Sequence, residues 1–217
     1  MAIKARAQLA ADTTLAPQAV QLLLARLDAQ RPLDQHRVDL LTLATDAVHD
    51  AQSIAPQRNI TLEVFDGPGT PEVVGDEARL RQVLGNLVAN ALQHTPVRAG
   101  ITVRVGTVGN EAVLEVVDQG PGMDQQDAQR VFERFYRTDS SRTRSSGGTG
   151  LGLSIVDSLV HAHNGTVTVT TAPGRGCRFR VALPRVADAA EHAEDTDDFG
   201  DVADDAELVN PVLPERL

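Results

Sequence analysis

Apolar residues recur three and four positions apart in the segment 76–94, which is the spacing of one face of an α-helix. The apolar stripe of this segment comprises Leu80, Val83, Leu84, Leu87, Val88 and Ala91. A similar stripe predicts a helix over 15–28, and further helices are predicted over 38–55 and 150–163. The short helix over 15–28 cannot be stable alone in water, so it needs a partner surface.

Shorter apolar segments bounded by turn residues predict β-strands. They cover residues 60–65, 101–108, 112–118, 166–172 and 177–183. A Gly-Asn turn joins the second strand to the third, and the sequence PGRG joins the last two, so each pair is predicted to form a hairpin. Paired hairpins with helices between them indicate an α+β fold, a two-layer sandwich with helices on one face of a mixed sheet.

The negative charge of the chain is concentrated at its C-terminal end. Of 30 acidic and 20 basic residues, 11 acidic residues and one arginine lie within 187–217, which leaves 19 of each sign in the remainder. The tail is therefore predicted to be disordered, and the body has no charge bias toward nucleic acid. We expect an N-terminal segment over 1–34, a folded domain over 35–186 and an acidic tail over 187–217.

The composition of the chain indicates its cellular compartment and excludes some kinds of functional group. The single cysteine, Cys177, excludes an internal disulfide and a cysteine-based metal cluster, and it fits a reducing compartment. No segment approaches the roughly 20 apolar residues of a membrane-spanning helix, and the N-terminus lacks an apolar run of signal-peptide length. We therefore expect a cytoplasmic domain without membrane contact of its own. Lys4 is the only lysine, so functional cations of the body must be arginine or histidine.

The sequence SSGGTGLGLSIV, residues 145–156, places four glycines in six positions before a predicted helix. A P-loop is excluded because no Lys-Ser/Thr pair follows the glycines, and a Rossmann loop is disfavoured because the preceding residues are polar rather than a buried strand. A third interpretation is a flap that closes onto the helix N-terminus, where free N–H groups favour phosphate. Thr149 is then expected to cap the helix. A loose glycine linker is the alternative.

A second candidate site is the sequence VVDQGPGM, residues 116–123. Here a predicted buried strand ends in Asp118, whose carboxylate can accept a hydrogen bond from an amino group such as adenine N6. Gly120 and Gly122 would leave room for a flat ring. The alternative is an ordinary Asx-type turn.

Two more segments add candidate groups. Asn86 and Asn90 lie four residues apart and share one flank of the helix over 76–94. Their amide oxygens are hard ligands suited to Mg²⁺, although two polar surface residues would show the same pattern. The sequence VFERFYR, residues 131–137, holds three of the six aromatic residues and could fix one end of the flap to the core; a plain packing cluster is the alternative.

These four segments, in this order, resemble the ATP-binding catalytic domain of sensor histidine kinases, within the wider group that contains gyrase B, Hsp90 and MutL. The matching motifs are the N box NLVANALQH (86–94), the G1 box DQGPG (118–122), the F box FERFY (132–136) and the G2 box GTGLGL (148–153). The later sequence APGRGCRF matches the Gly-x-Gly-x-x-Phe turn of the domain. The resemblance covers about residues 35–185 and implies the Bergerat-type ATP-binding fold. Each motif is weak alone, but the ordered set is highly specific.

The resemblance implies ATP and Mg²⁺ as cofactors. Asn90 is expected to ligate the Mg²⁺ that bridges the ATP phosphates, with Asn86 beside it. Asp118 is expected to receive the adenine amino group, and Gly120 and Gly122 to shape the adenine pocket.

The resemblance also implies a lid over the phosphates. Its phosphate-facing hinge is expected to comprise Gly148, Thr149, Gly150, Leu151 and Gly152. Arg142 and Arg144 in the lid are candidates to neutralise the γ-phosphate. His94, the last residue of the N box, and Thr95, which follows it, are expected to line the site.

The sequence departs from the family pattern in two ways. The lysine that many members carry three residues after the second N-box asparagine is Gln93 here. The acceptor motif, a histidine followed by acidic, basic, Thr/Asn and Pro residues, is absent; His49 comes nearest, and His161 and His163 are expected to be surface or packing residues. The acceptor is therefore expected on a dimerisation domain that is missing or belongs to another chain.

The tract LLLARLD…RPL within 1–34 resembles the end of a dimerisation helix and its linker, and the closest likeness is to actinobacterial membrane-sensor kinases.

The implied function is transfer of the γ-phosphoryl of Mg-ATP to that histidine, for relay to a response regulator. Two alternatives stay open. The chain could be a non-catalytic nucleotide-binding module that regulates a partner kinase, or an anti-sigma-type serine kinase, which uses the same fold.

Overall fold

The structure is a computed structural model that describes residues 32–136 and 150–187. The helices of this part are α3 (Leu40–Ile54), α4 (Glu77–His94), α5 (Gln125–Arg130) and α7 (Gly152–Ala162). The strands are β1 (His36–Asp39), β2 (Ile60–Phe65), β3 (Glu72–Gly75), β4 (Ile101–Val108), β5 (Glu111–Asp118), β6 (Thr166–Thr171) and β7 (Cys177–Pro184). The predicted helix over 15–28 and the acidic tail from residue 188 lie outside the described residues.

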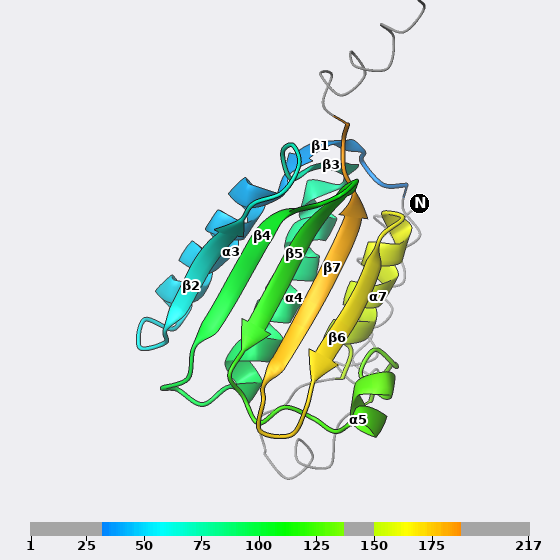
Figure 1. Ribbon diagram of the computed structural model, residues 1–217. Helices are drawn as coiled ribbons and strands as arrows, with labels where there is room; N and C mark the ends of the chain where they lie inside the picture. Colours follow the sequence, from blue (N-terminus) through cyan, green and yellow to red (C-terminus); the bar gives the residue numbers. More distant parts are fainter. Residues whose placement is uncertain (1–31, 137–149, 188–217) are drawn as a thin grey trace, which may run out of the picture. The chain divides into compact units, whose positions relative to one another are not determined.

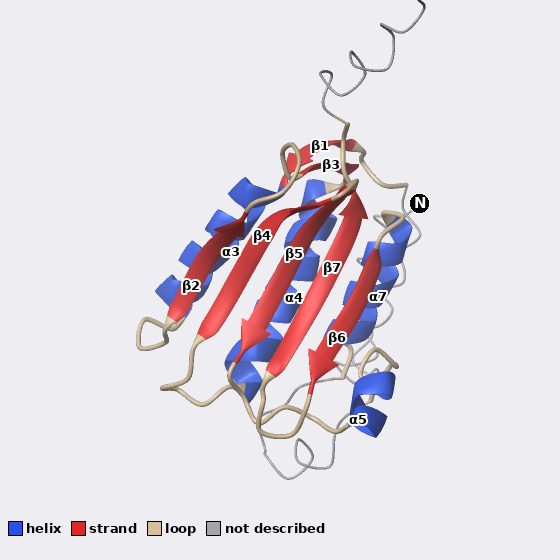
Figure 2. Cartoon of the chain, in the orientation of Figure 1, coloured by secondary structure: helices blue, strands red, loops and turns tan. Residues whose placement is uncertain are grey.

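Five strands form one mixed sheet in the order β2-β4-β5-β7-β6. Strand β2 is parallel to β4, and the other neighbours are antiparallel. Helices α3, α4 and α7 cover one face of this sheet (Figures 1 and 2). The predicted two-layer α+β sandwich is therefore confirmed, and both predicted hairpins are present as β4–β5 and β6–β7.

The core lies between the helices and the sheet because each layer presents an apolar face to the other. All six residues of the apolar stripe predicted for α4 are buried, and they pack in one cluster with inward-facing residues of the central strands, including Val103, Val116 and Phe179. Full burial of such side chains contributes about 1.5–3 kcal/mol each. Asp76 begins α4 by accepting a hydrogen bond from the Arg79 N–H at 3.1 Å.

The other face of the sheet carries a row of charged residues. Strand pairing places Glu63, Arg104, Glu115 and Arg180 side by side on β2, β4, β5 and β7. Arg104 bonds Glu63 at 3.2 Å and Glu115 at 2.9 Å, and Arg180 lies 3.5 Å from the second oxygen of Glu115. The Glu115 side chain is only 5% exposed, so these arginines compensate its charge.

The structure also corrects three sequence predictions. Strands β1 and β3 form a small antiparallel sheet in segments that were predicted as loop or helix. Helix α5 lies between the predicted strand over 112–118 and the predicted helix over 150–163, where no helix was predicted. Helix α7 begins at Gly152, with Leu151 as an N-cap that makes no side-chain hydrogen bond, because Gly150 at φ +68° is not helical. The prediction that Thr149 caps this helix is therefore wrong, and Thr149 itself lies outside the described residues.

No helix within residues 32–136 and 150–187 is long and apolar enough to cross a membrane.

Candidate functional site

The candidate ligand-binding residues gather at one end of the five-stranded sheet. Helix α4 and strand β5 both end there, helix α7 begins there, and the turn between β6 and β7 lies beside them (Figure 1). The N box, the G1 box and the described part of the G2 box therefore share one edge of the domain, although they are far apart in the sequence.

Asp118 is the last residue of β5, and its side chain is buried. The residue is 4% exposed, and one carboxylate oxygen accepts a hydrogen bond from the Gly120 N–H at 2.7 Å. Burial raises the pKa of Asp118 above its ordinary value, and the Gly120 N–H opposes that shift because it favours the ionised form. A buried carboxylate with a raised pKa is typical of a functional site.

The two glycines of the G1 box have different structural roles. At Gly120, a Cβ atom would lie 2.6 Å from Asp118 Oδ1, 3.3 Å from the His94 carbonyl oxygen and 3.6 Å from Thr95 Oγ1, so these groups leave no room for a side chain. Gly122 has φ +65°, and a Cβ there would overlap the Ala172 carbonyl oxygen. Gly122 therefore lets the G1 turn approach the end of β6 closely, rather than simply leaving room for a ring.

The turn between β6 and β7 supports the G1 box. The Gly174 N–H donates to the Pro121 carbonyl at 2.7 Å, and a Cβ on Gly176 would overlap the Asp118 carbonyl oxygen. Thr171 Oγ1 accepts from the Met123 N–H at 3.1 Å and donates to the Gly176 carbonyl at 2.7 Å. The Gly-x-Gly-x-x-Phe motif thus holds the loop that follows Asp118, a role that the sequence did not reveal for Thr171.

Asn86 lies against the first residue of α7. A Cβ on Gly152 would lie 4.0 Å from Asn86 Oδ1, which brings the N box and the G2 box together. The Asn86 amide nitrogen is buried and has no hydrogen-bond partner in the structure. Asn90 is half-buried one turn further along α4. Both asparagines therefore lie on the flank of α4 beside the N-terminus of α7, whose first N–H groups have no intrahelical acceptor.

The F box contacts both the core and the start of the G2 box. The Phe132 ring packs edge-on against Phe179, with ring centroids 6.2 Å apart. The Phe135 N–H donates to the Gly150 carbonyl at 3.0 Å, and Phe135 has the unusual φ of +63°. The predicted attachment to the core is present through Phe132, whereas the Phe135 side chain is 56% exposed and does not enter the core.

Arg58 supports the site in a way that no sequence pattern indicated. Its guanidinium, from the loop before β2, donates to the Thr95 carbonyl at 2.6 Å and to the Leu92 carbonyl. These are carbonyls of the last turn of α4, which lack intrahelical donors. Arg58 thus caps the helix end that carries His94, whose charge lies near enough to lower the pKa of Asp118 slightly against the larger effect of burial.

Some predicted site residues cannot be placed. Arg142, Arg144, Gly148 and Thr149 lie outside the described residues. Within the residues that are described, no group of three or more His, Cys, Asp or Glu side chains could hold a metal ion.

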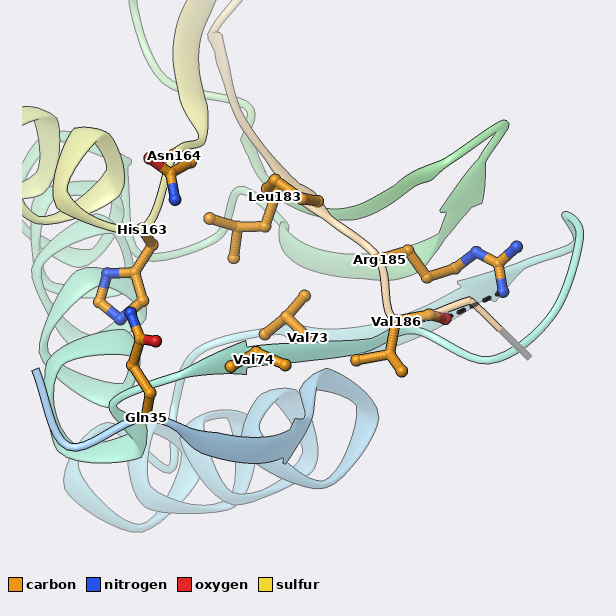
Figure 3. Close-up of a pocket in the computed structure, with 9 residues that line it drawn as sticks. Gln35, Val73, Val74, His163, Asn164, Leu183, Arg185 and Val186 are labelled. Carbon is orange, nitrogen blue, oxygen red and sulfur yellow. Dashed lines mark hydrogen bonds between the residues drawn. The ribbon is translucent and has the colours of Figure 1, made fainter. Parts of the chain in front are cut away.

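A separate cavity of about 270 Å³ lies at the opposite end of the domain, between β3 and the ends of α7 and β7 (Figure 3). His163 lines it, but both ring nitrogens are hydrogen-bonded. Nε2 accepts from the Asp76 N–H at 3.0 Å, so Nδ1 donates to the Leu159 carbonyl at 2.7 Å. This histidine therefore has a packing role, as expected from the sequence.

Comparison with known proteins identifies the family of this chain. Residues 75–187 match the family model of histidine kinase-, DNA gyrase B-, and HSP90-like ATPases. The chain is 49% identical over 164 residues to the probable sensor histidine kinase TcrY of Mycobacterium tuberculosis, covering 75% of this chain and 34% of TcrY. It therefore spans about a third of the length of that relative.

Solved structures show the same fold. The mycobacterial sensor histidine kinase MprB superposes with a TM-score of 0.61 at 31% identity, covering 70% of this chain and all of that structure. Full-length ShkA in complex with AMPPNP gives a TM-score of 0.61 at 29% identity, covering 73% of this chain and 33% of ShkA. With the motifs at one end of a matching fold, this chain belongs to the histidine kinase-, DNA gyrase B- and HSP90-like ATPase family and carries the ATP-binding catalytic domain of sensor histidine kinases.

Proposed function

We propose that this domain binds Mg-ATP and transfers its γ-phosphoryl group to a histidine on a helical dimerisation domain, from which an aspartate of a response regulator receives it. The observation that carries the proposal is Asp118, a buried carboxylate at the end of β5 beside a glycine whose position has no room for a side chain. The relatives are named as sensor histidine kinases, and ShkA was solved with the ATP analogue AMPPNP.

Asp118 is proposed to bind the nucleobase. Its carboxylate is an acceptor in a buried setting, where a hydrogen bond to an amino group is stronger than in water. The lack of a side chain at Gly120 is proposed to leave room for a flat ring, and His94 and Leu151 are proposed to line the rest of the pocket.

Asn90 and Asn86 are proposed to hold Mg²⁺ together with the ATP phosphates. The amide oxygens of both residues fit this ion, because Mg²⁺ prefers hard oxygen ligands and retains several waters. The buried Asn86 amide nitrogen, which lacks a partner within the structure, is a donor and would fit a phosphate oxygen. When bound, the ion would neutralise charge on the phosphate oxygens. Its binding needs no cluster of protein carboxylates.

The remaining roles fall to the lid and the start of α7. The N–H groups of Gly150 and Gly152 and the N-terminus of α7 are proposed to bind phosphate oxygens, together with Gly148 and Thr149. Arg142 and Arg144 are proposed to neutralise charge on the γ-phosphate. Because phosphoryl transfer needs little covalent chemistry from the protein, these residues act by positioning and charge stabilisation, while lid closure excludes water.

Calorimetric titration of the chain with ATP, with and without Mg²⁺, tests the binding half of the proposal. Asp118→Ala should reduce affinity at least about a hundredfold, because it removes a buried, charge-assisted hydrogen bond. Asp66→Ala, which changes an exposed aspartate in the loop between β2 and β3, is the matched control and should bind normally. Equal affinity of the two variants would refute the assigned nucleotide site.

Incubation with γ-labelled ATP and a separately supplied histidine-bearing helix bundle tests the transfer half. Acid-labile label on the bundle histidine supports the proposal. Tight binding without transfer would indicate a regulatory nucleotide-binding module, and acid-stable label on serine would indicate a serine kinase.

A further inference from the structure

Three polar groups lie close to Gly120 and leave no room for a side chain at this position. They are Asp118 Oδ1, the carbonyl oxygen of His94 and Thr95 Oγ1, which a Cβ atom on Gly120 would meet at 2.6, 3.3 and 3.6 Å. The two oxygens of Asp118 and His94 are acceptors only, whereas the Thr95 hydroxyl can donate. Thr95 therefore supplies the hydroxyl donor among these three groups.

The Thr95 hydroxyl is buried beside the Asp118 carboxylate. Thr95 is 4% exposed, and its Oγ1 makes no hydrogen bond of ordinary length and angle in the structure. Burying an unsatisfied hydroxyl is unfavourable, and such groups in folded proteins call for an explanation. A nearby acceptor exists, because the hydroxyl lies close enough to Asp118 to favour its ionised form, after the larger effects of burial and of the Gly120 N–H.

The backbone of Thr95 is held by hydrogen bonds on both sides. Its N–H donates to the Ala91 carbonyl at 2.9 Å, and its carbonyl accepts from Arg58 at 2.6 Å. Thr95 also caps the C-terminus of α4. These backbone contacts explain why Thr95 lies at the end of α4. They do not explain why this residue carries a hydroxyl beside the buried Asp118 carboxylate.

We propose that Thr95 is a positioning residue for nucleotide binding. Its hydroxyl donates a hydrogen bond to the Asp118 carboxylate when a nucleotide is bound. This bond keeps the other acceptor sites of the carboxylate directed at the amino group of the base. This inference rests on the proposed function. A carboxylate offers about four lone-pair sites. The Gly120 N–H occupies one, the Thr95 hydroxyl takes another, and the base amino group takes one of those that remain.

The proposal predicts a pH effect that a purely structural threonine would not produce. Removing the hydroxyl takes away a donor that favours ionised Asp118, so the already raised pKa of Asp118 rises further. Protonation of Asp118 removes an acceptor, so ATP affinity should begin to fall at a higher pH in the variant. The other titratable groups near Asp118 are His94 on α4 and Cys177 on β7, and both are unchanged in the comparison.

The test measures the dissociation constant of Mg-ATP for the full chain from neutral to mildly acidic pH. Thr95→Val keeps the side-chain shape without the hydroxyl, and it should weaken binding about tenfold and move the acid-side loss of affinity to higher pH. Thr95→Ser restores the hydroxyl and should retain the wild-type affinity and pH profile. Circular dichroism establishes that both variants are folded.

The outcomes separate this inference from the proposed function. If wild-type protein shows no Mg-dependent affinity for ATP, the proposed function fails and the inference with it. If wild type binds but Thr95→Val has the wild-type pH profile, whatever its affinity, only the inference is overturned. If Thr95→Val does not fold, Thr95→Ala takes its place in the same pH titration, and a wild-type pH profile of that variant would overturn the inference.

Discussion

Gly174 and Gly176 have nearly the same backbone conformation but different surroundings. Their φ values are +75° and +69°, in the left-handed region that favours glycine. A Cβ on Gly174 would meet no atom within 4 Å, whereas a Cβ on Gly176 would overlap the Asp118 carbonyl. The pair therefore separates the effect of backbone strain from the effect of close packing against the candidate site.

Alanine at these positions should have unequal effects on stability. Gly174→Ala should lower the free energy of unfolding by about 1 kcal/mol, from conformational strain alone. Gly176→Ala should lower it by about 3 kcal/mol, because overlap with β5 is added, and it should also weaken ATP binding by displacing Asp118. Urea denaturation and ATP titration measure both effects, and equal losses of stability would contradict the packing argument.

At the residue scale, the sequence predicted the positions of residues within elements better than the contacts between elements. Asp118 was predicted at the end of a buried strand, and the structure places it there. Gly122 was predicted to leave room for a ligand, which stays a prediction. The structure adds that this glycine allows two turns to touch, a contact that could not be predicted because a one-dimensional motif does not show which backbone lies opposite a glycine. The contact of Arg58 with the end of α4 joins residues far apart in the sequence, so no local pattern could predict it.

At the scale of elements, the row of charged residues across the sheet is expected to contribute measurably to the free energy of unfolding. Glu115 lies between Arg104 and Arg180 with almost no solvent exposure. By contrast, Arg81 pairs with Glu77 on the surface of α4, where both side chains are more than 40% exposed.

Double-mutant cycles should therefore give different coupling energies for these pairs. Combining Glu115→Gln with Arg104→Met should reveal a coupling of about 1 kcal/mol or more, because the pair is partly buried and hydrogen-bonded. Combining Glu77→Gln with Arg81→Met should give no more than about 0.5 kcal/mol. Both cycles are measured by urea denaturation, and a coupling at Glu115 no larger than at Glu77 would show that the row adds little stability.

The elements that were predicted correctly have strong local signals. Helix α4 has a complete apolar stripe, and the β4–β5 and β6–β7 hairpins have clear turn residues between apolar runs. Strands β1 and β3 were missed because each has four residues, and their pairing across about 35 positions gives no periodic signal. Helix α5 was missed because none of its residues is buried, so it has no apolar stripe.

At the scale of the whole molecule, His163 joins the end of α7 to the start of α4. Its ring accepts a hydrogen bond from the Asp76 N–H across 87 positions of sequence, and the residue is 5% exposed. Two residues earlier, His161 is exposed and contacts Asp157 on its own helix, with 3.2 Å between nitrogen and oxygen. These two histidines look alike in the sequence but differ in what they connect.

His163→Leu should lower the free energy of unfolding by about 2 kcal/mol, because the Asp76 N–H loses its acceptor. His161→Leu should change it by less than about 0.5 kcal/mol. Neither variant should alter ATP affinity, because both positions lie at the end of the domain opposite Asp118. Thermal unfolding and ATP titration provide the comparison, and a loss of affinity in the folded His163→Leu variant would contradict this separation of the two ends.

Cys177 is the single cysteine of the chain and is buried beside Asp118. Burial raises the pKa of its thiol, so little of the reactive thiolate forms near neutral pH. The native sulfur should therefore react slowly with maleimides and mild oxidants. A fluorophore or spin label attached to a newly introduced surface cysteine would then report from one chosen position, without removal of the native thiol.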